Sequence, residues 1–191
     1  MRVACTFGWS LTQQTIPALL KSAVMRQNTI IVVPSYFDFV RLNNYLRKSD
    51  QVSYEAISEC AQSCATLLPK LTRRYSSPRE ISRARTLFFK GKKSFLIVTE
   101  RFHFYRRYKL RGAKTIVFYS LPDHAQFYAE FMQTPFLPGQ NGQGETVDVD
   151  EAEVSSRVLI SRFDVLKLER VVGSEDARRM LTSGEGRFEF I

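Results

Sequence analysis

The chain has 191 residues, of which 44% are hydrophobic and 25% charged, and its formal net charge is +9. Three cysteines, an odd number, exclude a disulfide framework, and no run approaches the roughly 20 apolar residues that span a bilayer. We therefore expect one soluble, intracellular domain over residues 1–191, with no membrane association. The positive charge favours a polyanionic partner, nucleic acid before membrane, although a merely solvated basic surface is the alternative.

Strand and helix patterns alternate along the chain. In chain order the sequence predicts a helix at 11–25, a strand at 29–34, a helix at 35–46, a strand at 51–57, a helix at 79–89, strands at 94–98 and 115–119, a helix at 123–132, a strand at 154–161, helices at 163–172 and 174–181, and a strand at 187–191. These are about six strands and six helices. The alternation indicates an α/β fold with a mostly parallel sheet and helices on both faces.

Two segments interrupt this alternation. Residues 58–78 are polar with a basic end, which is typical of a surface insertion. Residues 135–153 are rich in glycine and then acidic, which predicts a flexible loop. Both segments are expected to be surface additions to the single domain.

The connection between the strands at 94–98 and 115–119 is basic and aromatic. Its cations are Arg101, Arg106, Arg107, Lys109, Arg111 and Lys114, and its rings are Phe102, His103, Phe104, Tyr105 and Tyr108. The carboxyl end of a strand is where open α/β sheets usually place a ligand. Cations and stacking rings suit single-stranded nucleic acid. The alternative is that Phe102, Phe104 and Tyr105 belong to the core and the arginines form a solvated rim.

The sequence offers no catalytic, metal-binding or cofactor-binding constellation. It has no Gly-x-x-x-x-Gly-Lys-Ser/Thr loop to cradle a nucleoside triphosphate. Ser120, Asp123 and His124 are close in sequence only, and helix capping is the better interpretation of the last two. Cys60 and Cys64 have no second ligand pair that would complete a tetrahedral metal site.

The order of these segments resembles the second RecA-like lobe of DEAD-box-type helicases. Residues 29–46 are similar to the strand and helix of motif IV, and residues 79–100 to the helix, Phe-x-x-Gly and strand that lead into motif V. Thr99 matches the threonine of the Thr-Asp pair in motif V, and Glu100 stands in place of the aspartate. The resemblance implies a three-layer RecA-like fold.

A more detailed resemblance covers about residues 29–180, apart from the two interruptions. VPSYFDFVRLNNYL, TERFHFYRRY, VFYSLPDH and FDVLKLERVVGSEDARRM are similar to the C-terminal part of the digestive organ expansion factor family, also called U-three small nucleolar RNA-associated protein 25. The resemblance implies a nucleolar protein of the nucleus that acts in the small-subunit processome and in 18S pre-rRNA processing. The implied partners are pre-rRNA or small nucleolar RNA and the processome proteins.

The resemblance also implies a degenerate helicase without enzymatic activity. An active lobe carries arginines after the Leu-Pro strand that offset charge on the transferred phosphate. No arginine lies between Leu121 and Val154, and Glu130 stands in that region. Two alternatives stay open: the second lobe of an active ATP-dependent RNA helicase whose first lobe is supplied separately, and a purely structural module that docks on protein.

The resemblance assigns RNA contact to the strand ends and turns of motifs IV and V. Ser82 stands at the position of a phosphate-binding arginine in the preceding helix, and Arg83 and Arg85 lie beside it. The expected RNA-binding residues are Ser35, Tyr36, Arg83, Arg85, Thr99, Arg101, Arg106, Arg107, Lys109 and Arg111.

Overall fold

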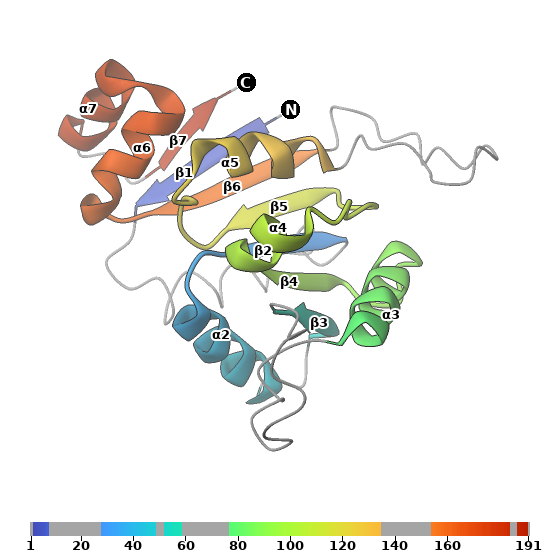
Figure 1. Cartoon of the computed structure of the whole chain (residues 1–191). Helices are drawn as coiled ribbons and strands as arrows, with labels where there is room; N and C mark the ends of the chain where they lie inside the picture. Colours follow the sequence, from blue (N-terminus) through green and yellow to red (C-terminus); the bar gives the residue numbers. More distant parts are fainter. Residues whose placement is uncertain are drawn as a thin grey trace.

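The computed structural model describes residues 2–7, 28–48, 52–58, 77–134, 154–183 and 187–190. In these ranges one sheet has the strand order β3-β4-β2-β5-β6-β1-β7 (Figure 1). Its strands are β1 (Arg2–Phe7), β2 (Thr29–Val33), β3 (Tyr54–Ile57), β4 (Phe95–Thr99), β5 (Thr115–Phe118), β6 (Ser155–Ile160) and β7 (Arg187–Phe190). Every neighbouring pair is parallel except β1 and β7, which are antiparallel.

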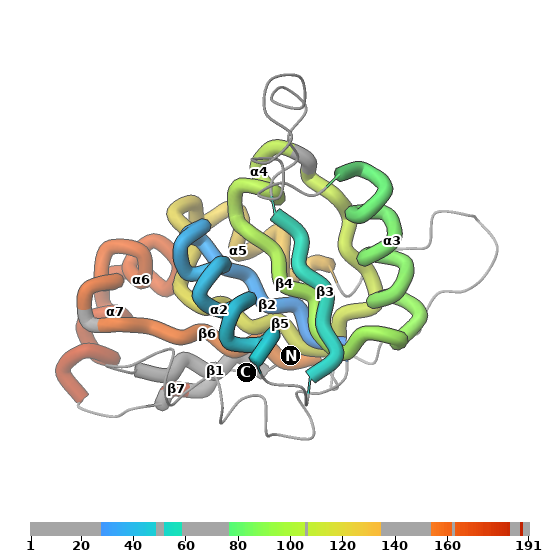
Figure 2. The backbone as a smooth tube through the Cα atoms, turned by 90° about the horizontal axis from the view of Figure 1, so that it is seen from below, coloured from blue at the N-terminus to red at the C-terminus, as the bar shows by residue number. Residues whose placement is uncertain are grey.

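Helices cover both faces of the sheet (Figures 1 and 2). They are α2 (Tyr36–Lys48), α3 (Pro78–Phe89), α4 (Glu100–Arg106), α5 (Ala125–Met132), α6 (Val165–Val172) and α7 (Ser174–Thr182), with a short 3-10 helix, η5 (Arg162–Asp164), before α6. The helix α2 packs on one face, and α3 to α7 contribute to the core on the other. The predicted α/β fold is therefore confirmed.

The central strands are buried on both faces, as their apolar, β-branched runs predict. Every residue of β2, β4 and β5 is buried. Because side chains alternate along a strand, Ile30 and Val32 join the core beneath α3 to α7, whereas Ile31 and Val33 join the core beneath α2. The parallel strands all end at one edge of the sheet, where α2, α4 and η5 follow them.

The sheet has one more strand in the described residues than the six expected. The additional strand is β1, which lies between β6 and β7. Its sequence, RVACTF, has no run of β-branched residues that would predict a strand. The strand forms because it pairs with β6 and β7, which are far away in sequence. The expected helix at 11–25, most of the insertion at 58–78 and the loop at 135–153 lie outside the described residues.

A helix, α4, occupies the segment expected as a connection after β4. Thr99 caps it: the hydroxyl oxygen accepts a hydrogen bond from the backbone N–H of Phe102 at 3.3 Å. Phe102 and His103 are buried on its inner side, with exposures of 1% and 6%. The helix ends at Arg107, whose φ of 45° is left-handed. The alternative interpretation of this run is therefore right for Phe102 and wrong for Phe104 and Tyr105, which are 51% and 63% exposed on the outer side of the helix.

The beginnings and ends of the other helices follow local signals. The helix α3 begins with a capping box between Ser77 and Glu80, and α6 ends at Gly173 as expected. The expected capping of α5 by Asp123 and His124 is wrong. His124 occupies the N-cap position but makes no side-chain cap hydrogen bond. The carboxylate of Asp123 pairs with Lys167 of α6 rather than with the start of α5.

Candidate nucleic-acid interface

The carboxyl edge of the sheet brings together the residues that follow β2 and β4. The two strands are adjacent, with Val33 opposite Thr99, so Ser35 and Tyr36 lie near the start of α4. The hydroxyl of Ser35 accepts a hydrogen bond from the N–H of Phe37 at 3.2 Å. Thr99 is 1% exposed and engaged as the cap of α4. Its side chain therefore supports the helix rather than presenting a free hydroxyl at the surface.

The outer side of α4 is exposed and aromatic. Arg101, Phe104 and Tyr105 are exposed, and the guanidinium carbon of Arg101 lies 5.9 Å from the ring centre of Tyr105. The side chain of Arg106 lies outside the part of the chain that the structure describes. This surface therefore places Arg101 beside two rings that are not among the expected site residues.

Arg107 is engaged by Glu130 of α5. Its guanidinium forms an ion pair with Glu130 and lies 5.0 Å from the ring centre of Phe127. The other oxygen of Glu130 accepts a hydrogen bond from Nε2 of His103 at 2.5 Å. The three side chains tie α4 to α5 through one carboxylate. The half-exposed Arg107 is thus a structural contact as well as an expected phosphate ligand.

The titratable groups of this cluster, His103 and Glu130, have shifted pKa values. Burial lowers the pKa of His103, although Glu130 opposes this shift. Burial tends to raise the pKa of Glu130, but the hydrogen bonds from His103 and Arg107 outweigh it and hold the pKa below its ordinary value. A neutral His103 that donates to an ionised Glu130 fits both directions.

A second group of expected residues lies on α3 and on the loop from Arg107 to Lys114. Arg85 donates a hydrogen bond to the carbonyl oxygen of Lys109 at 2.9 Å and stacks over Tyr108, with 5.0 Å between the guanidinium carbon and the ring centre. Burial, and to a smaller extent the charge of Arg111, lower the pKa of Arg85. Arg83 and Lys109 are exposed.

The same loop holds a buried donor. The Nε atom of Arg111 is buried and has no hydrogen-bond partner among the described residues. Gly112 seats the loop against α3, because a Cβ at this position would lie 3.2 Å from a ring carbon of Phe89. The structure therefore brings Arg85, Lys109 and Arg111 together along α3, separately from the strand ends that carry Ser35 and Thr99.

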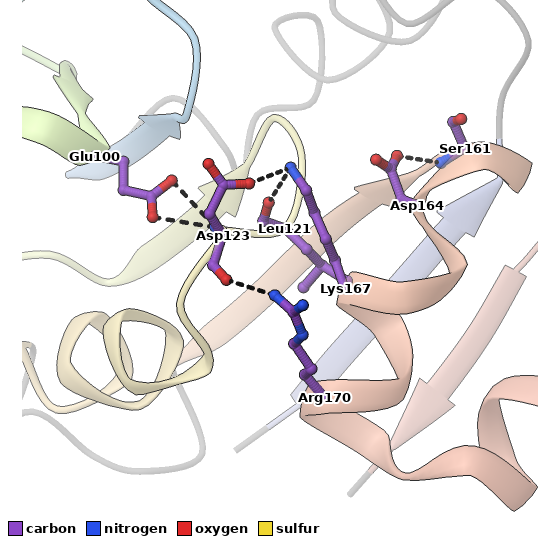
Figure 3. Close-up of polar contacts among 7 residues, drawn as sticks. All are labelled: Glu100, Leu121, Asp123, Ser161, Asp164, Lys167 and Arg170. Carbon is purple, nitrogen blue, oxygen red and sulfur yellow. Dashed lines mark hydrogen bonds and ion pairs between the residues drawn. The ribbon is translucent and has the colours of Figure 1, made fainter.

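Sequence reasoning missed a polar network around Asp123 (Figure 3). The buried carboxylate of Glu100 accepts the backbone N–H of Asp123 at 3.1 and 3.3 Å. Nζ of Lys167 lies 2.8 Å from the carboxylate of Asp123, and Arg170 donates to its carbonyl oxygen at 3.1 Å. The network joins the ends of β4, β5 and β6. The sequence singled out Glu100 by its match to a motif position and Asp123 as a capping candidate, but it gave no sign that the two are in contact.

Burial and charge set the state of Glu100. Burial raises its pKa, while the N–H groups of Asp123 and His124 act in the opposite direction. The residue thus fixes the loop after β5 at the cost of desolvating a carboxylate. This arrangement has a structural role, since it links the residues that follow β4, β5 and β6.

The described ranges contain neither a candidate metal cluster nor a helix that could span a membrane. No group of three or more histidine, cysteine, aspartate or glutamate side chains there could hold a metal ion. Among the same residues, no helix is long and apolar enough to cross a bilayer.

The chain matches a family model described as "Utp25, C-terminal domain" over residues 7–68 and 70–190. It is 39% identical over 171 residues to the U3 small nucleolar RNA-associated protein 25 homolog of Rattus norvegicus, covering 90% of this chain and 19% of that protein. It is 34% identical over 183 residues to the U3 small nucleolar RNA-associated protein 25 of Sclerotinia sclerotiorum, covering 94% of this chain and 23% of that protein. The chain thus spans about a fifth of the length of these curated relatives.

Solved structures with the same fold are helicase domains. The C-terminal domain of the DEAD-box protein Dbp5 matches with a TM-score of 0.58 and 14% identity, over 96% of this chain and 84% of that chain. The Escherichia coli DEAD-box protein SrmB, bound to regulator of ribonuclease activity A, matches with a TM-score of 0.56 and 14% identity, over 87% and 81%. At this identity the likeness shows the fold alone, which is that of a RecA-like C-terminal helicase domain.

Proposed function

The chain belongs to the family of the Utp25 C-terminal domain, and on this premise we propose that it is a non-catalytic RNA- and protein-binding module of the small-subunit processome. The observation that carries the proposal is the family match over nearly the whole chain. Relatives in this family are named for association with U3 small nucleolar RNA. The proposed role is assembly of the particle that processes the 18S precursor, in the nucleolus, with pre-rRNA or small nucleolar RNA and processome proteins as partners.

The absence of ATP hydrolysis is part of this proposal. The sequence holds no Gly-x-x-x-x-Gly-Lys-Ser/Thr loop, and no arginine follows Leu121 before Val154. A working lobe needs positive charge at the transferred phosphate. The helix α5 instead carries Glu130, which Arg107 and His103 already engage. The helix α5 carries no arginine that could offset the charge of a transferred phosphate, which supports a binding role for a fold of helicase type.

The proposed RNA contacts are phosphate contacts by exposed or half-exposed cations. Arg101 at the carboxyl edge, Arg83 on α3 and Lys109 beside α3 are exposed. No ion pair of Arg83, Lys109 or Arg111 with a carboxylate occurs among the described residues, so these cations are available to phosphates in that part of the chain. Ser35 and Tyr36 add polar groups near the start of α4. Single-stranded RNA suits such a surface because its backbone can follow an irregular track of charge.

Crosslinking in cells followed by RNA sequencing tests the proposed function. The tagged chain is expected to enrich 18S precursor or U3 small nucleolar RNA over other nuclear RNA. The matched control carries Arg83→Glu, Arg101→Glu and Lys109→Glu, which should reduce the RNA crosslinks. Recovery of processome proteins with no crosslinked RNA would instead identify a protein-docking module, and recovery of neither would reject the proposal.

A further inference from the structure

The outer side of α4 carries two exposed rings beside an arginine. Phe104 is 51% exposed and Tyr105 63%, and the two rings meet edge to face with centres 5.1 Å apart. Arg101 lies over Tyr105. Residues spaced by three and four lie on one side of a helix, so these three side chains form one surface, which we call the α4 platform.

Packing does not account for this exposure. Phe102 and His103, on the inner side of α4, are the residues of this helix that are buried against the core. Leaving two rings in water is unfavourable, and adjacent exposed rings commonly mark a binding surface. Phe104 is also held in place, because its ring contacts Phe127 of α5 with 6.1 Å between centres. A ring that is held before binding loses little freedom when a ligand stacks on it.

The charges around the platform favour a polyanion. The acidic side chain of α4, Glu100, is buried and accepts the N–H of Asp123. The acidic side chain of α5, Glu130, is taken up by Arg107 and His103. Neither helix therefore presents an uncompensated carboxylate to the platform, whereas the charged member of the platform, Arg101, is an exposed cation. Charge complementarity thus selects a nucleic acid over a basic or neutral partner.

We propose that the α4 platform stacks unpaired bases of single-stranded RNA, with Tyr105 and Phe104 as the stacking rings and Arg101 beside them. The inference rests on the proposed RNA-binding function and adds a base contact to the phosphate contacts described above. Phosphate contacts alone would hold paired and unpaired RNA alike, while stacking requires bases that are free of a duplex. The platform therefore gives the module a preference for single strands.

Fluorescence anisotropy with a labelled, uridine-rich single-stranded RNA tests the inference. Phe104→Ala combined with Tyr105→Ala is expected to weaken binding about 5- to 100-fold, the range of stacking losses on alanine substitution. The slope of log affinity against log salt should stay unchanged because the phosphate contacts remain. An abasic oligonucleotide of equal length, and a duplex RNA, should each bind the wild-type chain and the variant equally.

Three variants keep the test decisive. Tyr105→Phe retains the ring and should bind the RNA with the affinity of the wild-type chain. Tyr105→Leu retains an apolar side chain but has no ring to stack on a base, so its affinity should be lower. Phe163→Ala removes a ring that is 92% exposed on η5, outside the platform, and should have no effect. Normal affinity in the Phe104 and Tyr105 variants would overturn the inference and point to a protein partner. Failure of the wild-type chain to bind any RNA would instead reject the RNA-binding function itself.

Discussion

At the residue scale, Glu100 shows how a position that resembles a helicase motif has become structural. Its side chain is buried, and its carboxylate accepts hydrogen bonds from the backbone N–H of Asp123. The loop after β5 is thereby fixed to the start of α4. Burial raises the pKa of Glu100 above the ordinary value of 4.5. The folded chain therefore holds this proton more tightly than the unfolded chain does.

We predict that the raised pKa of Glu100 makes the free energy of unfolding fall as the pH rises. The folded pKa is raised, so the folded state binds more protons from pH 4.5 up to the shifted value, and the free energy of unfolding decreases across that window. Glu100→Gln keeps an oxygen acceptor for the N–H of Asp123 but does not titrate. Urea unfolding from pH 4 upward should show the wild-type chain losing stability relative to this variant. Parallel curves for the two proteins would contradict the prediction.

Arg107 gives a second prediction at this scale. Arg107→Glu would set a carboxylate against Glu130 and remove the cation from Phe127. Losing a partner from a partly buried charged hydrogen bond costs about 1–3 kcal/mol. Lys109→Glu changes an exposed side chain and should shift stability by no more than about 0.5 kcal/mol. Denaturant unfolding of the two variants measures both values, and equal stabilities would show that the pair with Glu130 contributes nothing.

At the scale of elements, the loop from Arg107 to Lys114 depends on how closely it meets α3. Gly112 has φ +78° and faces Phe89, whereas Gly91 has φ +67° and open space within 4 Å of the point where a Cβ would lie. A non-glycine residue in either backbone conformation costs about 1–2 kcal/mol. The pair therefore separates backbone strain from crowding.

We predict that Gly112→Ala destabilises the chain more than Gly91→Ala. Only the alanine at 112 adds a contact of 3.2 Å with a ring carbon of Phe89. Thermal unfolding should therefore show a lower midpoint for Gly112→Ala, and the displaced loop should also weaken RNA binding through Lys109 and Arg111. If both variants unfold at the same temperature, the Phe89 ring moves aside without a loss of stability and the prediction is wrong.

Elements also show what the sequence could predict. The strands β2, β4 and β5 are apolar, β-branched runs buried on both faces, so local pattern and tertiary structure agree. The helix α4 was not predicted from the sequence, because the cations of this segment indicated a connection. The spacing of its residues is nevertheless that of a helix with two sides, with Phe102 and His103 on the buried side and Arg101, Phe104 and Tyr105 on the exposed side. The periodicity of that segment, rather than its charge, was the useful signal.

The polar contacts of the site could not be predicted in the same way. Glu130 and Arg107 are 23 residues apart, and Asp123 and Lys167 come from loops and helices that only the sheet brings together. No local pattern encodes which of several cations a carboxylate will meet. The cations of the expected site, such as Arg107, can be read from the sequence, and their RNA contacts stay a prediction, while their partners in the structure required the fold.

For the whole molecule, the proposed absence of catalysis predicts no ATP turnover even when a first lobe is supplied. Mixing the chain with the separately produced first lobe of a DEAD-box helicase, with ATP and RNA, should give no RNA-stimulated phosphate release. The same first lobe with its own second lobe serves as the active control. Turnover above that of the isolated first lobe would establish the helicase alternative.

The position of β1 has a consequence for how the sheet is assembled during synthesis. This strand occupies residues 2–7 but lies between β6 and β7, which begin at Ser155 and Arg187. At a synthesis rate of about 5–20 residues per second, β1 leaves the ribosome on the order of ten seconds before either neighbour exists. An unpaired strand over that interval is open to chaperones and to wrong pairing. The sheet is therefore completed only after β7 has been synthesised and has paired with β1.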